Sequence, residues 1–98
     1  MARVRYTRAS REDLKRLYCF LLERDRASAE QAFAAIEKAV ALIAQFPFSC
    51  RKAVADNPLL REFLIPFGSA GYVLLYEIED ADTVTILAVR HQREDDYH

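Results

Sequence analysis

The last apolar run of the chain is followed by a dense polar cluster whose residue types could cleave a phosphodiester. Residues 90–93 read Arg-His-Gln-Arg, and three consecutive acids follow at 94–96. A histidine can act as an acid or a base near neutral pH, and an arginine can hold a phosphate group. With Arg61, at the start of another expected strand, the cluster could supply a base, an acid and cations for the developing charge. Ribonuclease-type cleavage is therefore one interpretation.

The same cluster has a second interpretation as a solvated tail. Arg90 and Arg93 would then pair with the acids that follow them in the chain. Three consecutive acids beside a phosphate site would also repel an anionic substrate. The residue types alone therefore favour the tail over a catalytic centre.

The cysteines, histidines and glycines do not form another kind of site. Cys19, Cys50, His91 and His98 lack the spacing of metal ligands, so we expect no metal. Both glycines fall in one expected hairpin, which leaves no glycine-rich phosphate loop. Cys19 lies on an expected helix and is interpreted as a structural thiol rather than a nucleophile. We therefore expect no cofactor.

Length and composition indicate one globular domain spanning residues 1–98. The chain is 52% hydrophobic and 30% charged, which is typical of a folded protein. Its net charge is −1, whereas proteins that bind nucleic acid usually carry a basic excess. Residues 1–9 lack the apolar core of a signal peptide, and no run reaches the roughly 18 apolar residues of a membrane span. Two cysteines without a C-x-x-C spacing fit a reducing compartment, so we expect a cytoplasmic protein without a membrane partner.

Two helices are expected in the first half of the chain, after a short edge strand near residues 3–6. The first helix begins at Ser10, carries leucines at helical spacing and ends near residues 24–26. The second begins at Ser28 and ends at Phe46, because the following proline cannot continue a helix. The short connection predicts an antiparallel hairpin. The apolar stripe of the second helix is expected to consist of Phe33, Ile36, Val40 and Ile43.

The second half of the chain predicts a three-stranded antiparallel meander after a loop at residues 47–60. The strands are expected at residues 61–67, 72–79 and 83–90, with short turns between them. The fold class is therefore α+β, with an N-terminal strand, an antiparallel two-helix hairpin and a three-stranded antiparallel meander.

Both faces of this expected sheet are partly apolar, although two helices can cover only one of them. Tyr72 and Tyr76 share a face with Leu74, while Val73 and Leu75 point the other way. The uncovered face should either meet a partner, a dimer mate or a ligand, or be buried by strong curling of the sheet. The two tyrosines are expected to pack against the helices, and an aromatic platform for bases is the other possibility.

With this layout, the chain resembles the RelE/ParE superfamily of type II toxin–antitoxin toxins. The order of elements matches over nearly the whole chain. Three stretches carry the resemblance: residues 61–68 (REFLIPFG), 71–77 (GYVLLYE) and 86–93 (ILAVRHQR). The last stretch is especially typical of the ParE, or plasmid-stabilisation, branch.

The resemblance implies one of two activities. ParE-type toxins inhibit DNA gyrase, whereas RelE-type toxins cut messenger RNA on the ribosome with basic residues and often a C-terminal tyrosine or histidine. The net charge of −1 and the closing Arg-His-Gln-Arg-Glu pattern fit the ParE branch better, so a gyrase inhibitor that is not an enzyme is the leading hypothesis. An inactive interaction module of the same fold is a further alternative. A nuclease of the RelE type would use Arg61, Arg90, His91 and Tyr97.

The resemblance also implies a cognate antitoxin, held with the toxin in a hetero-oligomer. Its C-terminal segment would fold across the toxin as a helix and a strand, and we expect it on the uncovered apolar face of the sheet. The candidate partner-binding residues are Arg61, Tyr72, Tyr76, Arg90, His91 and Arg93.

Overall fold

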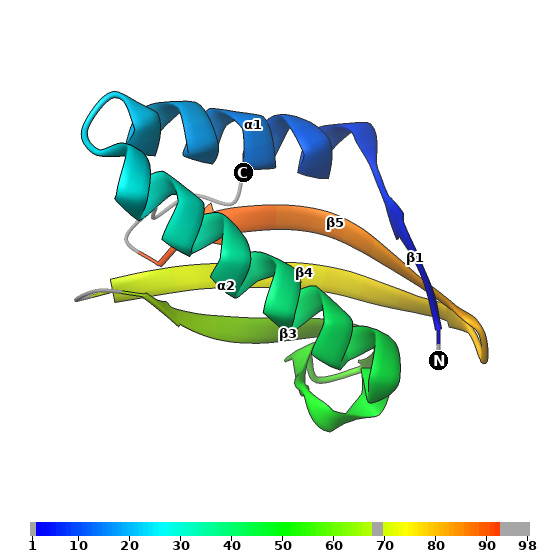
Figure 1. Cartoon of the computed structure of the whole chain (residues 1–98). Helices are drawn as coiled ribbons and strands as arrows, with labels where there is room; N and C mark the ends of the chain where they lie inside the picture. Colours follow the sequence, from blue (N-terminus) through cyan, green and yellow to red (C-terminus); the bar gives the residue numbers. More distant parts are fainter. Residues whose placement is uncertain (1, 68–69, 93–98) are drawn as a thin grey trace.

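The computed structural model describes residues 2–67 and 70–92 and shows an α+β fold (Figure 1). A strand and two helices come first, and a run of strands follows. In chain order the elements are β1 (Arg3–Tyr6), α1 (Arg8–Leu22), α2 (Arg26–Gln45), the short 3-10 helix η1 (Pro47–Ser49), β2 (Arg51–Val54), β3 (Asn57–Phe67), β4 (Ala70–Asp80) and β5 (Thr83–His91).

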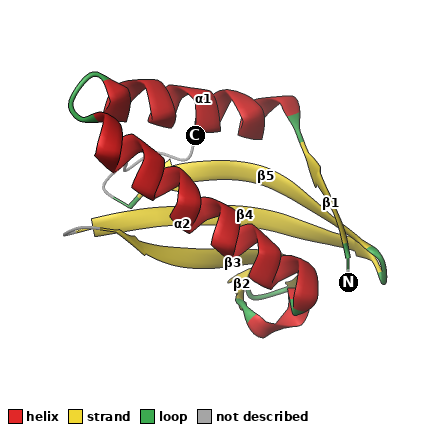
Figure 2. Cartoon of the chain, in the orientation of Figure 1, coloured by secondary structure: helices red, strands yellow, loops and turns green. Residues whose placement is uncertain are grey.

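The strands form one sheet in the order β1-β5-β4-β3-β2. The pairs β2–β3, β3–β4 and β4–β5 are antiparallel, whereas β1 lies parallel to β5, with Val4 opposite Val84. The helical hairpin connects the first strand to the rest and lies against one face of the sheet (Figure 2). The expected fold class is confirmed.

The helices begin earlier than the sequence pattern predicted. Thr7, rather than Ser10, caps α1: its hydroxyl oxygen accepts a hydrogen bond from the amide of Ser10 at 3.0 Å. Asp25 caps α2 by accepting from the amide of Ala27 at 3.2 Å and the hydroxyl of Ser28 at 2.9 Å. Hydrogen bonds from Ser28 and Ala27 lower the pKa of the Asp25 carboxyl. The serines predicted as starts therefore lie inside the first turns.

The loop predicted at residues 47–60 is wrong, because much of this segment forms strand. After η1, β2 pairs with the beginning of β3, with Arg51 opposite Glu62 and Val54 opposite Asn57. Asn57 and Pro58 read as loop residues in the sequence, but they start β3 beside the two-residue turn that joins the hairpin. The antiparallel part of the sheet, β2 to β5, therefore has four strands instead of the predicted three.

The main core lies between the helices and the sheet. Figure 1 shows α1 running above β5 and α2 crossing in front of β4 and β3. Alanines at 29, 32 and 39 are 5% exposed or less, which brings α2 close to the sheet. Phe33 was predicted in the buried stripe but is 37% exposed, because the helix turns its alanine side inward. The described apolar side chains with 0% exposure are Ile43, Leu74, Tyr76, Val84, Ile86 and Val89.

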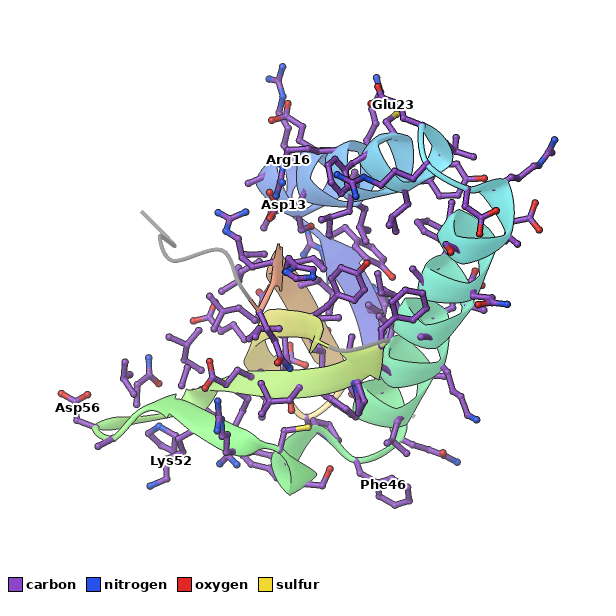
Figure 3. All side chains as sticks on the ribbon, turned by 90° about the vertical axis from the view of Figure 1, so that its left-hand side faces the viewer. Asp13, Arg16, Glu23, Phe46, Lys52 and Asp56 are labelled. Carbon is purple, nitrogen blue, oxygen red and sulfur yellow. The ribbon has the colours of Figure 1, made fainter. Side chains whose placement is uncertain are left out.

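The other face of the sheet mixes polar and apolar side chains. Among the described residues no helix lies on this side, as Figure 3 shows from a viewpoint turned by 90°. The strand register gives two rows of neighbours here: Leu64, Val73 and Arg90, and Glu62, Leu75 and Ala88. Val73 is 7% exposed and Leu64 is 40% exposed. The expected apolar face is therefore exposed at Leu64 but buried at Val73, and each row ends in a charged residue.

Candidate functional site

Arg90, the first candidate of the polar cluster, is held by an acid that lies far away in the sequence. Its Nη1 donates to Oδ1 of Asp13 on α1 at 2.6 Å, and the two side chains are 21% and 12% exposed. Asp13 Oδ2 also accepts the backbone N–H of Val89 at 3.0 Å. The guanidinium is thus already paired with a carboxylate, which leaves it less able to hold a phosphate.

Asp13 connects α1 to the part of β5 that lies beyond β1. The register of β1 on β5 ends at Ile86, and no strand among the described residues pairs with this edge of β5 from Leu87 to His91. The hydroxyl of Thr7 donates to the carbonyl of Leu87 at 3.3 Å, and Asp13 then accepts the amide of Val89. Figure 3 shows Asp13 and Arg16 projecting from the same side of α1. Thr7, the N-cap of α1, and Asp13 on α1 therefore form hydrogen bonds with backbone groups at this edge of the sheet.

His91 lies at the end of β5, partly exposed and against an aromatic ring. Its imidazole meets Tyr72 edge-on, with ring centroids 5.6 Å apart and planes at 85°. Tyr72 in turn contacts Phe67 at a centroid distance of 5.8 Å. The imidazole is therefore part of an aromatic cluster at this end of the sheet.

Arg61 stabilises the turn before β2 and does not join His91. Its guanidinium donates to the carbonyl oxygens of Pro58 at 2.6 Å, Phe48 at 3.1 Å and Cys50 at 2.7 Å. It also stacks on the Phe48 ring at 5.2 Å. Glu62, the next residue in the chain, pairs with Arg51 at 2.7 Å.

The candidates named from the sequence are not brought together into one centre. Arg61 is opposite Tyr76 on β4, whereas His91 is opposite Tyr72, four residues away along that strand. At a rise of about 3.3 Å per residue, this separates the two levels by about 13 Å. Arg93 and Tyr97 lie outside the described residues.

Tyr72 and Tyr76 belong to the core in this structure. They are 2% and 0% exposed, as their expected packing against the helices requires. The hydroxyl of Tyr76 donates to the carbonyl of Pro47 at 2.5 Å. Burial is the main cause that raises the pKa of both tyrosines. Neither ring offers a surface on which a base or a partner side chain could stack.

A concave surface lies between α1 and α2, where sequence reasoning placed no site. A hollow of about 280 Å³ is lined by Tyr18 from α1 and by Glu30, Phe33, Ala34 and Glu37 from α2. A signal for it was present in the sequence, since residues 30, 33 and 37 share one side of a helix. We call this surface, with its neighbouring hollow of about 220 Å³ around Tyr6, Arg11 and Leu14, the interhelical groove.

The described residues form neither a metal-binding group nor a membrane-spanning helix. Within residues 2–67 and 70–92, no group of histidines, cysteines and acids could hold a metal ion. Neither α1 nor α2, over the part of the chain that the structure describes, is long and apolar enough to cross a membrane.

The family follows from the sequence as a whole. A family model described as "ParE toxin of type II toxin-antitoxin system, parDE" matches residues 4–96. The chain belongs to the ParE toxin family. This match confirms the resemblance to the RelE/ParE superfamily that the strand motifs indicated. Within that superfamily it assigns the chain to the ParE branch.

Solved structures agree with the ParE assignment at the level of the fold. The chain is similar to the chromosomal ParDE toxin–antitoxin system from P. aeruginosa, with a TM-score of 0.70, 16% identity, and coverage of 93% of this chain and 96% of that chain. It is also similar to the solution structure of a conserved hypothetical protein from Helicobacter pylori, with a TM-score of 0.50, 14% identity, and coverage of 94% and 96%. No curated protein sequence matches the chain.

Proposed function

We propose that this ParE-family protein acts as the toxin of a type II toxin–antitoxin pair by inhibiting DNA gyrase, and that a cognate antitoxin neutralises it. The observation that carries the proposal is the family match over residues 4–96. That match spans both helices and every strand from β2 to β5. Gyrase inhibition is the activity expected of this family.

The placement of the arginines supports a protein target rather than cleavage of messenger RNA. Arg90 is paired with Asp13, and Arg61 is engaged by three carbonyl oxygens. A nuclease needs cations that can turn to the developing charge of a phosphate, and these two guanidiniums already have acceptors. The net charge of −1 also gives little general attraction to RNA.

The antitoxin has an apolar surface available at the edge of the sheet. A shallow hollow of about 360 Å³ lies between the end of α2 and the β2–β3 pair. Leu42, Phe63 and Leu64 line it, together with the Arg51–Glu62 ion pair. Leu42 is 44% exposed and Leu64 is 40% exposed. Leu64 also belongs to the sheet face without helices, so an amphipathic segment that binds here would continue onto that face.

The direct test is the supercoiling activity of purified bacterial DNA gyrase on relaxed plasmid. We expect the full chain at micromolar concentration to reduce supercoiling and to leave cleaved DNA after protein is removed under denaturing conditions. The control is Leu74→Asp, which places a carboxylate at a fully buried position and should unfold the chain. Unchanged supercoiling with folded wild-type protein would refute gyrase inhibition.

The two alternatives predict different outcomes in separate assays. For a ribosome-dependent endonuclease, transcripts in a cell-free translation reaction would be cut by wild-type protein but not by His91→Ala. We expect intact transcripts with both proteins. For an inactive interaction module, induction of the chain in cells that lack the antitoxin would not slow growth, whereas we expect filamentation.

A further inference from the structure

The interhelical groove combines aromatic rings with carboxylates in a way that the proposed inhibition of gyrase does not use. The helices are joined at residues 23–25 and diverge toward β1 (Figure 1). Its two hollows share Phe33 and Glu37. The ring of Phe33 therefore lies between both hollows, with the Glu37 carboxylate at its side.

The aromatic part of the groove consists of the Tyr18 and Phe33 rings. Tyr18 and Phe33 meet edge-to-face, with centroids 5.4 Å apart and planes at 65°. Phe33 is 37% exposed although it lies on the side of α2 that faces α1. An exposed ring face attracts a cation through the ring quadrupole, and the alkyl stem of an arginine or lysine can lie along it.

The charges around the groove favour a cation at one end. Glu37 makes no ion pair with the residues that the structure describes. Glu30 pairs with Arg26 at 3.2 Å, but both side chains are more than half exposed, so the pair is weak and easily exchanged. Arg11 is the basic residue of the second hollow, near Tyr6. The first hollow is lined by two acids and no base, and is therefore the one that suits a cation.

Glu37 on α2 affects the pKa of Tyr6 on β1. Burial, and then the charge of the Glu37 carboxylate, raise the pKa of the Tyr6 hydroxyl. Glu37 thus faces the groove rather than open solvent alone. A partner cation between Glu37, Phe33 and Tyr18 would meet a carboxylate that makes no ion pair with the described residues.

We propose that the first hollow of the interhelical groove binds one arginine or lysine side chain of the antitoxin. The side chain's stem lies along Phe33 and Tyr18, and its charged head lies between Glu30 and Glu37. The identity of the partner rests on the proposed function, whereas the chemistry of the hollow does not. Charge complementarity selects a basic segment over an acidic or a purely apolar one.

The first experiment tests the hollow without any antitoxin. N-acetyl-arginine amide is titrated into the full chain to about 50 mM, a range that detects the weak affinity of a single cation–aromatic contact. The measurement is the NMR shift of the Phe33, Tyr18 and Glu37 signals, and N-acetyl-citrulline amide is the uncharged control ligand. We expect saturable shifts with arginine and at least about threefold weaker binding with citrulline.

Two variants make this experiment specific. Glu37→Gln should weaken arginine binding about three- to tenfold, and Glu12→Gln, an exposed acid that pairs with Arg8 elsewhere on α1, should leave it unchanged. Equal binding of arginine and citrulline, equal binding in Glu37→Gln, or no shifts at these residues would overturn the proposal. Melting temperatures of both variants establish that they are folded.

The second experiment identifies the partner. The affinity of the cognate antitoxin is measured for wild type, Glu37→Gln and Glu12→Gln at low and high salt. We expect a loss of about three- to tenfold for Glu37→Gln alone, and a smaller loss at high salt. An unchanged affinity would overturn the assignment of the antitoxin as the source of the cation. A wild-type chain without effect on gyrase would remove the proposed target but leave the result of the arginine titration standing.

Discussion

Asp13 on α1 and Arg90 on β5 form an ion pair between a helix and the sheet, with Oδ1 and Nη1 2.6 Å apart. The second oxygen of the same carboxylate accepts the amide of Val89 at 3.0 Å. One side chain therefore accepts hydrogen bonds from both a guanidinium and a backbone amide at this edge of β5. Arg90 belongs to the polar cluster that invited a catalytic interpretation, and its partner gives it a structural task.

The first prediction is that loss of the Asp13 carboxylate destabilises the fold. Asp13→Ala leaves the Val89 amide and the Arg90 guanidinium without their acceptor in a nearly buried place, so we expect a loss of about 2–4 kcal/mol in the free energy of unfolding. Asp13→Asn keeps an acceptor for the amide and should lose less. Urea denaturation followed by circular dichroism measures both.

An exposed pair provides the control for that measurement. Glu12 and Arg8 are one helical turn apart on α1, and their side chains are 68% and 93% exposed. Glu12→Ala should therefore change the stability only slightly. If Asp13→Ala were as mild as Glu12→Ala, the link between α1 and β5 would not be a main source of stability.

The features that could be predicted from the sequence are those set by local spacing of residues. Helical spacing and period-two alternation are local, so the helices and the strands of the meander were predicted in the right order. β2 was missed because it is a short edge strand with Arg51 and Lys52, a composition that protects an edge but resembles a loop. The helix starts were placed late because Thr7 and Ser10 are both plausible caps.

The candidate site was harder to predict than the fold. Asp13 and Arg90 are 77 residues apart, and no spacing rule connects them. The interhelical groove depends on how far two helices diverge, which the sequence does not encode locally. The only local sign was the placement of Glu30, Phe33 and Glu37 on one side of α2, and the aromatic ring had been assigned to the core.

The second prediction concerns Gly71 at the start of β4. A Cβ atom added there would lie 2.2 Å from the carbonyl oxygen of Ile65 and 3.1 Å from its carbonyl carbon. The obstacle is backbone, so it cannot rotate away, and we expect Gly71→Ala to cost about 1–3 kcal/mol. Thermal unfolding measures the loss, with Ala81→Ser in the exposed β4–β5 turn as the control. Equal melting temperatures for the two variants would contradict the close approach.

The third prediction is that lysine cannot replace Arg61. The guanidinium reaches three carbonyl oxygens and lies over the Phe48 ring, and a single ammonium group cannot reproduce that planar fork. We expect Arg61→Lys to lower the stability by about 1–2 kcal/mol. The loss should be local, with faster hydrogen exchange of amides in residues 47–54 than in β4 and β5. Uniformly faster exchange would show that Arg61 supports the whole fold instead.

The last prediction uses Tyr76 as a sensor of alkaline unfolding. Burial, followed by its neighbour Cys50, raises the pKa of the Tyr76 hydroxyl above that of an unfolded tyrosine, about 10. The folded state therefore keeps its proton while the unfolded state loses it, so stability is intact below about pH 10 and falls as the pH rises further. The slope from this one group cannot exceed about 1.4 kcal/mol per pH unit.

Tyr76→Phe removes the hydrogen bond to Pro47 and should cost about 1 kcal/mol at neutral pH. Its stability should then fall less steeply than that of wild type in urea denaturation between about pH 9 and 11, since one titrating group is gone. Parallel curves for the two proteins would mean that Tyr76 ionises in the folded state as readily as in the unfolded one.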